Sequence, residues 1–310
     1  MLSLTFLGTG AACPTVDRNV SALALAREGE TILFDCGEGT QRQMMRYGVS
    51  FGVREICFTH FHSDHMLGLT GLLRTMGLLN LMGQNDREDG LTLYGPKGAK
   101  AILGAAINLG IERTKFPVDI IELRPGDALK RAEYDILAFD TEHRADTLGY
   151  ALAEHTRLGR FNPERARELG VPEGPLWGRL HRGETVTLAD GRTVGPGDLV
   201  GPERPGRTVV ISGDTRPHPS LREAAKGADL LVHEATFGED EAERARDSGH
   251  STAREAAAIA KAAGVKRLVL THISPRYSRE APELLAEARM VFPETTIARD
   301  GMVVELAYQD

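Results

Sequence analysis

The sequence predicts an α/β protein, and three observations support this fold class. Residues 31–34 and 55–59 are nearly continuous apolar runs, which are typical of strands buried on both faces. Residues 66–81 carry leucine and methionine at helical spacing, which predicts a helix packed against a sheet. Strand-like and helix-like segments alternate along most of the 310 residues, and a chain of this length can build a core without disulfides or a structural metal.

In the first half of the chain, glycine turns separate the expected strands. We expect a polar helix at 41–47, the apolar helix at 66–81 and a further helix at 97–109. The expected strands are residues 3–7, 21–26, 31–35, 55–59, 91–94, 118–123, 134–140 and 148–153.

The composition changes between Arg157 and Gly206. Periodic apolar patterns fade there, proline and glycine multiply, and the only tryptophan, Trp177, follows Gly174 and Pro175. A segment of this length without core signals is either an insertion that projects from the domain or a disordered linker. Its arginines could contact phosphates, but acidic residues alternate with them, so charge alone does not decide between these interpretations.

Regular alternation resumes in the last third of the chain. Thr252 followed by Glu255 is a capping-box pattern, which predicts the start of an alanine-rich helix that Gly264 ends. A second helix is expected at 282–291. The expected strands are residues 209–212, 230–232, 268–271, 295–298 and 302–306.

The overall charge and the cysteine content limit the function classes. A formal charge of -7 gives no global attraction to nucleic acid or anionic membranes, so a polyanionic substrate needs a local basic patch or a metal. Three cysteines are too few for a disulfide framework, which fits a reducing compartment. Residues 1–7 lack the basic start of a signal peptide, and no apolar run approaches the length of a membrane span. We therefore expect a cytoplasmic protein without a membrane segment.

The densest group of metal-binding side chains is His60, His62, Asp64 and His65, directly after the apolar run at 56–58. Imidazole nitrogens and carboxylate oxygens are the ligands that zinc and similar divalent metals accept. A loop that leaves a buried strand can turn such side chains toward one point. A histidine-rich polar loop is the alternative, but three histidines and one aspartate within six residues favour a metal site.

Three more candidate ligands, His143, Asp214 and His272, follow expected strands farther along the chain. Alone, Asp214 could be a turn residue, and either histidine could be structural. Polar residues at strand ends are how many α/β folds assemble a site at one edge of a sheet. Together with the first cluster they make seven ligands, which suits two ions better than one. A carboxylate can bridge two ions, so Asp214 is the bridging candidate.

These residues resemble the metal motif of the metallo-β-lactamase fold superfamily. Further segments resemble one branch of it, the tRNA 3′-processing endoribonucleases called ribonuclease Z or tRNase Z. The segments that carry this second resemblance are residues 6–10, 19–22, 34–41, 212–216, 233–236, 249–252 and 271–277, together with the insertion after the strand at 148–153.

The resemblance implies an α/β four-layer αββα sandwich, with 1–310 as a single domain and residues 155–206 as an inserted, protruding arm that binds tRNA. It implies two zinc ions per subunit, a homodimer, and an acid–base pair formed by Glu234 and His250. One ion would be held by His60, His62 and His143, the other by Asp64, His65 and His272, with Asp214 between them. The resemblance implies Gly174 and Pro175 as tRNA-binding residues of the arm, and Arg157 and Arg160 are candidates because their charge suits phosphates.

The implied activity is a zinc-dependent endoribonuclease that removes 3′ trailers from precursor tRNA and leaves a 3′-hydroxyl. A metal-activated water would attack the phosphodiester, with Asp64 orienting it and His250 protonating the departing oxygen. The alternatives are a small-molecule phosphodiesterase or arylsulfatase-like hydrolase of the same fold, and an RNA-binding module with a structural metal. Val16 stands where the family often has lysine in a Pro-x-Lys-x-Arg-Asn loop, so the handling of CCA-ending tRNA stays open.

Overall fold

The computed structural model describes residues 1–82, 90–277 and 279–308. It divides the chain into two compact units. The first consists of residues 1–131, 135–152 and 208–307, and the second of residues 132–134, 153–207 and the chain from Tyr308. Each unit is described by itself below.

One sheet of the first unit is built mainly from the first 122 residues. In the described part of the chain its seven strands lie in the order β16 (Val303–Leu306), β1 (Leu2–Gly8), β2 (Ala22–Arg27), β3 (Glu30–Phe34), β4 (Glu55–Cys57), β5 (Leu91–Gly95) and β6 (Val118–Glu122). Strands β3 to β6 are parallel, whereas β16, β1 and β2 pair antiparallel. The last strand of the chain thus pairs with the first.

The other sheet of this unit is built mainly from the second half of the chain. Its strands lie in the order β15 (Thr295–Ile297), β14 (Leu268–Thr271), β13 (Leu230–Glu234), β12 (Thr208–Ile211), β9 (Leu148–Glu154), β8 (Tyr134–Asp140) and β7 (Ala128–Lys130). Strands β12 to β15 are parallel, so their carboxyl ends meet at one edge. This edge carries the candidate site.

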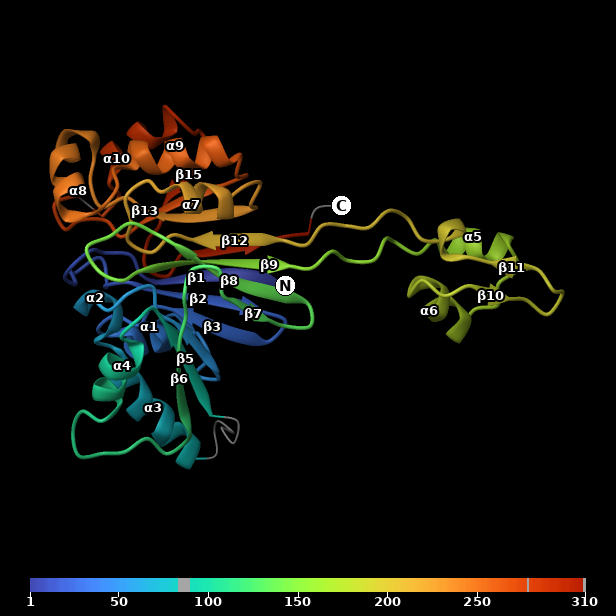
Figure 1. Cartoon of the computed structure of the whole chain (residues 1–310), viewed down its shortest axis with the longest axis horizontal. Coiled ribbons are helices and arrows are strands. Elements are labelled where there is room, and N and C mark those ends of the chain that lie inside the picture. The colour runs from blue at the N-terminus through green and yellow to red at the C-terminus, as the bar shows by residue number, and fades with distance from the viewer. Residues whose placement is uncertain (83–89, 278, 309–310) are drawn as a thin grey trace. The chain divides into compact units, whose positions relative to one another are not determined.

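The two sheets face each other, and helices cover their outer faces (Figure 1). The helices on the first sheet are α1 (Thr40–Tyr47), α2 (Ser63–Met66), α3 (Leu69–Leu81) and α4 (Ala99–Ile107). Those on the second are α7 (Pro219–Ala224), α8 (Ala242–Ser248), α9 (Ala253–Ala263) and α10 (Pro282–Arg289). Separate apolar cores fill the space between each sheet and its helices. This arrangement confirms the predicted four-layer αββα fold.

The helix predicted at 66–81 is two helices, α2 and α3, separated near Gly68. Gly68 has ordinary helical torsions, but a Cβ atom there would lie 1.9 Å from the carbonyl oxygen of Gly37. The close approach packs this turn against the segment that follows β3. Because α2 begins at Ser63, it fixes the directions of Asp64 and His65.

The second unit contains its own elements and its own core. It includes α5 (Pro163–Glu168), α6 (Pro175–His181), the hairpin of β10 (Val186–Thr187) and β11 (Thr193–Val194), and a short 3₁₀ turn at Pro196–Asp198. Buried Ala166, Val171, Leu180 and Val186 pack together, with Trp177 against them. These elements lie in the segment between Arg157 and Gly206, which the sequence alone could not assign to either an insertion or a disordered linker.

None of the helices in the described ranges combines the length and the apolar character that crossing a bilayer requires.

Candidate metal centre

The ends of strands from both sheets bring the seven candidate ligands together. His60 and His62 follow β4, and α2 carries Asp64 and His65. The other three follow strands of the second sheet: His143 after β8, Asp214 after β12 and His272 after β14. Ligand atoms lie within 4.8 Å of one another in the set His60, His62, His143 and Asp214, and also in the set Asp64, His65 and His272.

The imidazole rings direct nitrogens at one another. Nε2 of His60 lies 3.0 Å from Nδ1 of His62, which lies 3.2 Å from Nε2 of His143. In the second set, Nε2 of His65 lies 3.3 Å from Nε2 of His272. The ligand atoms of each set therefore point toward one another.

The opposite nitrogens of three rings are held by acceptors. Nδ1 of His143 donates to the carbonyl of Gly249 at 2.8 Å, and Nδ1 of His65 donates to Asp35 at 2.7 Å. Nδ1 of His272 lies 2.8 Å from the Thr236 hydroxyl. That hydroxyl donates its own proton to Glu234 at 2.8 Å, so it accepts from His272.

These anchors fix the tautomers of His65, His143 and His272, and in each neutral ring the inward Nε2 then carries a lone pair. Lone pairs at about 3 Å from each other repel unless a cation lies between them. The donor set therefore fits a divalent metal, and the outer hydrogen bonds are of the kind that orient metal-binding histidines.

Asp214 lies between the two sets. Its Oδ2 is 3.3 Å from Nε2 of both His65 and His272, and 3.6 Å from Nε2 of His60. The carboxylate is buried, which would raise its pKa, but His272 and His65 hold the pKa well below its usual range. An ionised carboxylate at this position can serve both sets.

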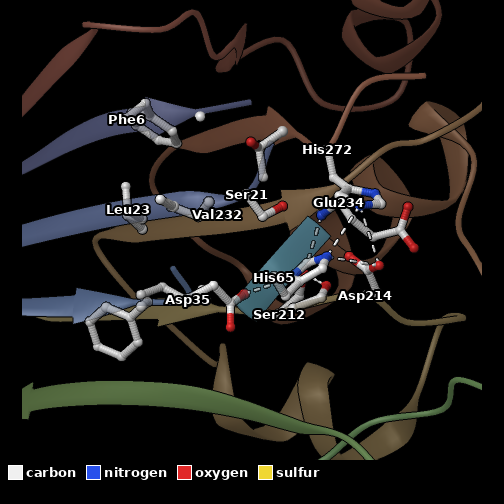
Figure 2. Close-up of a pocket in the computed structure, with 16 residues that line it drawn as sticks. Phe6, Ser21, Leu23, Asp35, His65, Ser212, Asp214, Val232, Glu234 and His272 are labelled. Carbon is white, nitrogen blue, oxygen red and sulfur yellow. Dashed lines mark hydrogen bonds and ion pairs between the residues drawn. The ribbon is translucent and has the colours of Figure 1, made fainter. Parts of the chain in front are cut away.

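A cavity of about 40 Å³ lies beneath this group, between the two sheets. Figure 2 shows Phe6 and Leu23 of the first sheet and Val232 of the second along it, and His65, Asp214 and His272 turned toward one another at its polar end. The cavity is thus lined by apolar side chains at one end and by the candidate ligands at the other.

His250 and Glu234 form a pair beside the cluster. Nδ1 of His250 lies 2.9 Å from Glu234 Oε1 and 3.9 Å from Asp214 Oδ2. Burial alone would lower the pKa of His250, but the Glu234 carboxylate outweighs it and raises the pKa to about 9. Glu234 is buried and also accepts from the backbone amides of Thr215 and Thr236. The Glu234 carboxylate therefore favours the protonated form of His250.

Two further contacts to the cluster were not predicted from the sequence. Asp35 accepts from His65 and from the amide of Thr59 at 2.7 Å. The amide of Ala12, whose φ is 63°, donates to Asp64 Oδ2 at 2.7 Å. Asp35 follows a buried strand, which is the same signal that identified Asp214. No sequence signal marks Ala12, because alanine rarely adopts a positive φ.

The four arm residues belong to the second unit. The guanidinium of Arg157 lies 3.3 Å from the ring centroid of Tyr308, and its Nε and Nη2 atoms are buried. Arg160 lines a surface groove together with Phe161 and Arg167. Gly174, at φ 134°, precedes Pro175, the first residue of α6.

Comparisons with known proteins place this geometry in a family. The model of the metallo-β-lactamase superfamily matches residues 15–272. A ribonuclease Z of Gemmatimonas aurantiaca is 59% identical over 308 residues, covering 99% of this chain and 96% of the relative. A ribonuclease Z of Myxococcus xanthus is 54% identical, covering 100% of this chain and 99% of the relative.

A solved structure agrees with these relatives. The short form of human tRNase Z is 29% identical with a TM-score of 0.70, covering 98% of this chain and 99% of that one. The metallo-β-lactamase fold protein YhfI of Bacillus subtilis, at 21% identity and a TM-score of 0.70, covers 98% of each chain and shares the fold. The chain belongs to the ribonuclease Z family of the metallo-β-lactamase superfamily.

Proposed function

We propose that this protein is a metal-dependent endoribonuclease that removes 3′ trailers from precursor tRNA and leaves a 3′-hydroxyl on the tRNA. Full-length relatives named ribonuclease Z, at 46% to 59% identity, and the likeness to human tRNase Z support this activity. The observation that carries it is the pair of His250 and Glu234 beside seven candidate ligands. Phosphodiester hydrolysis needs such an acid as well as a metal, because an alkoxide leaves poorly without a proton.

We propose two zinc ions as the cofactor. His60, His62 and His143 would hold one ion, and Asp64, His65 and His272 the other. Asp214 would be shared, since its Oδ2 lies close to histidines of both sets. When bound, zinc ions lower the pKa of a water and offset negative charge on the phosphate oxygens.

Two side chains beside the candidate metal site would orient the water and supply the proton. Asp64 orients the attacking water, and the Ala12 amide holds its carboxylate in place. His250, protonated through its pairing with Glu234, donates a proton to the departing 3′-oxygen. Glu234 keeps its own position through Thr236 and the amide of Thr215, so the acid is oriented before substrate arrives.

We propose that residues 155–206 are an inserted arm of an otherwise single 1–310 domain, and that this arm binds tRNA. A separate core around Leu180 supports a preformed surface rather than a flexible tether. Several of its arginines are paired with carboxylates, as in Arg167 with Glu173 and Arg179 with Glu184. Arg157, Arg160, Gly174 and Pro175 remain the proposed contacts, and shape rather than sequence would be recognised.

We further propose a cytoplasmic homodimer. Cys13, Cys36 and Cys57 are all free thiols, which fits a reducing compartment. Leu78 and Leu81 of α3 are exposed apolar side chains, as are Met82, Leu109 and Ile111, and burial of these side chains against a second copy would favour a dimer. Light scattering of the purified protein measures the oligomeric state.

The test of the activity is incubation of the zinc-loaded protein with precursor tRNAs that do or do not encode CCA. We expect a single cut at the 3′ trailer, a product ending in a 3′-hydroxyl, and loss of cleavage after chelation. Deleting 157–206 should abolish this cut and spare hydrolysis of bis-p-nitrophenyl phosphate. If the intact protein hydrolysed only the small diester, the assignment to tRNA would be wrong.

A further inference from the structure

An arginine next to the candidate metal ligands has no role in the chemistry described so far. Arg216 follows Asp214 by two residues, and its amide donates to the Glu142 carbonyl at 2.7 Å. This bond joins the segment after β12 to the segment that carries His143. The Arg216 side chain is 15% exposed.

The guanidinium of Arg216 connects the His250 main chain to α9. Its Nη1 donates to the carbonyl oxygen of His250 and, at 2.7 Å, to Glu255 Oε2. Its Nη2 donates to the other oxygen of Glu255, so the ion pair is bidentate. Glu255 also accepts from the Thr252 amide at 2.9 Å, within the capping box that begins α9.

The His250 backbone needs hydrogen bonds to hold it because the preceding residue is Gly249. Gly249 ends α8 in the left-handed conformation, at φ 77°, where glycine leaves the chain free to turn. The His250 amide donates to Ala245 at 2.8 Å, and Ser251 donates through its hydroxyl to Thr215 at 2.5 Å. Among the described contacts, Arg216 is the group that holds the His250 carbonyl.

We propose that Arg216, held by Glu255, is a positioning residue that places His250 for proton transfer to the leaving oxygen. The inference rests on the proposed acid role of His250. Three fixed points then define the imidazole: Glu234 at its ring nitrogen, Arg216 at its carbonyl and α8 at its amide. Lysine at position 216 keeps the charge but cannot bind the carboxylate through two nitrogens while also reaching the carbonyl.

The test compares two phosphodiesters that differ in their need for an acid. Precursor tRNA releases an alkoxide that requires a proton, whereas bis-p-nitrophenyl phosphate releases a stable phenolate. General acids contribute about 10²- to 10⁴-fold to the rate of such reactions. We expect Arg216→Lys to lower kcat on precursor tRNA by about 10- to 100-fold, which is part of that contribution. KM, bound zinc and turnover of the small diester should change less than about threefold.

Two variants and a control keep the test informative if Arg216→Lys is poorly folded. Glu255→Gln keeps an acceptor for the Thr252 amide but weakens the ion pair, so it should reproduce the selective loss to a smaller extent. Arg254→Gln alters a neighbouring residue whose pair with Glu239 spans 3.9 Å, and it should match the wild type on both substrates. Adding Arg216→Lys to His250→Ala should cost no further activity.

The outcomes separate this inference from the proposed function. Equal losses on both substrates would assign Arg216 to the metal cluster and overturn the positioning role, as would no loss at all. If His250→Ala lowered both activities alike, the acid role itself would fail. If His250→Ala were selective for precursor tRNA and Arg216→Lys were not, only the inference about Arg216 would fall.

Discussion

His65 and Asp35 form a buried pair in which Nδ1 of the imidazole lies 2.7 Å from a carboxylate oxygen. The pair presents the opposite ring nitrogen to His272 and Asp214. Asp35 also accepts from Thr59, which precedes His60, so one carboxylate supports two candidate ligands from the inner side.

The first prediction concerns metal affinity. Replacing Asp35 with alanine should lower zinc affinity about 10- to 100-fold, the usual effect of losing a carboxylate behind a ligating histidine. Competition with a chelator of known affinity measures this, and Asp35→Asn, which keeps an acceptor, should lose less. An unchanged affinity in Asp35→Ala would show that His65 needs no such support.

A second prediction follows from the close approach at Gly68. A Cβ there would lie 1.9 Å from the Gly37 carbonyl, so Gly68→Ala must displace α2 together with Asp64 and His65. We expect weaker metal binding and a free energy of unfolding lowered by about 1–3 kcal/mol. Gly104→Ala is the matched control, since a Cβ there meets no atom within 4 Å. Equal melting temperatures for both variants would contradict the prediction.

The third prediction concerns the pH dependence of catalysis. In the proposed mechanism the acid form of His250 donates the proton, and Glu234 raises the pKa of His250 to about 9. Single-turnover cleavage of precursor tRNA should therefore persist to about pH 9 and decline above it. In Glu234→Gln the effect of burial on the pKa dominates, so the decline should begin at a lower pH. A decline at the same pH in both proteins would assign it to another group.

The thiols provide a fourth prediction. Burial raises the pKa of Cys36 to about 12 and that of Cys57 well above its usual range, whereas Cys13 is exposed. One thiol per chain should react rapidly with a disulfide reagent in the native protein, and all three after denaturation. Cys13→Ser should abolish the rapid phase. A rapid phase that survives this substitution would show that a buried thiol is accessible.

A fifth prediction tests the second unit. Leu180 is fully buried in its core, so Leu180→Ala should destabilise this unit by about 2–5 kcal/mol. Precursor tRNA cleavage should fall, whereas hydrolysis of bis-p-nitrophenyl phosphate should not. Leu158→Ala, at a residue 45% exposed in the same unit, serves as the control. A parallel loss of both activities in Leu180→Ala would contradict a separate role for this unit.

The sequence predicted the strands better than the helices. Buried strands such as β12 and β14 are apolar runs, a signal that local composition carries. The short helices α7 and α8 were missed, since each has few buried residues and a mostly polar sequence. The break between α2 and α3 depends on contact with Gly37, which no local pattern records.

In the candidate site, too, some features follow from local sequence and others only from tertiary contacts. The seven candidate ligands could be predicted because side chains that can bind a metal follow strands, and the structure brings these side chains together. The stacking of Arg157 on Tyr308 joins residues far apart in the sequence, so only tertiary structure reveals it. The positive φ of Ala12 likewise follows from tertiary packing and leaves no trace in local composition.

The pairing of β1 with β16 has a consequence for synthesis of the chain. Leu2 lies opposite Leu306, so one edge of the first sheet stays open until translation has passed the last strand. Domains acquire structure as the amino-terminal part leaves the ribosome, and an open apolar edge is prone to aggregate. Because His272 is also a late residue, the nascent chain must remain incomplete in both its sheet and its metal centre for most of its synthesis. Protection by chaperones is needed most during that interval.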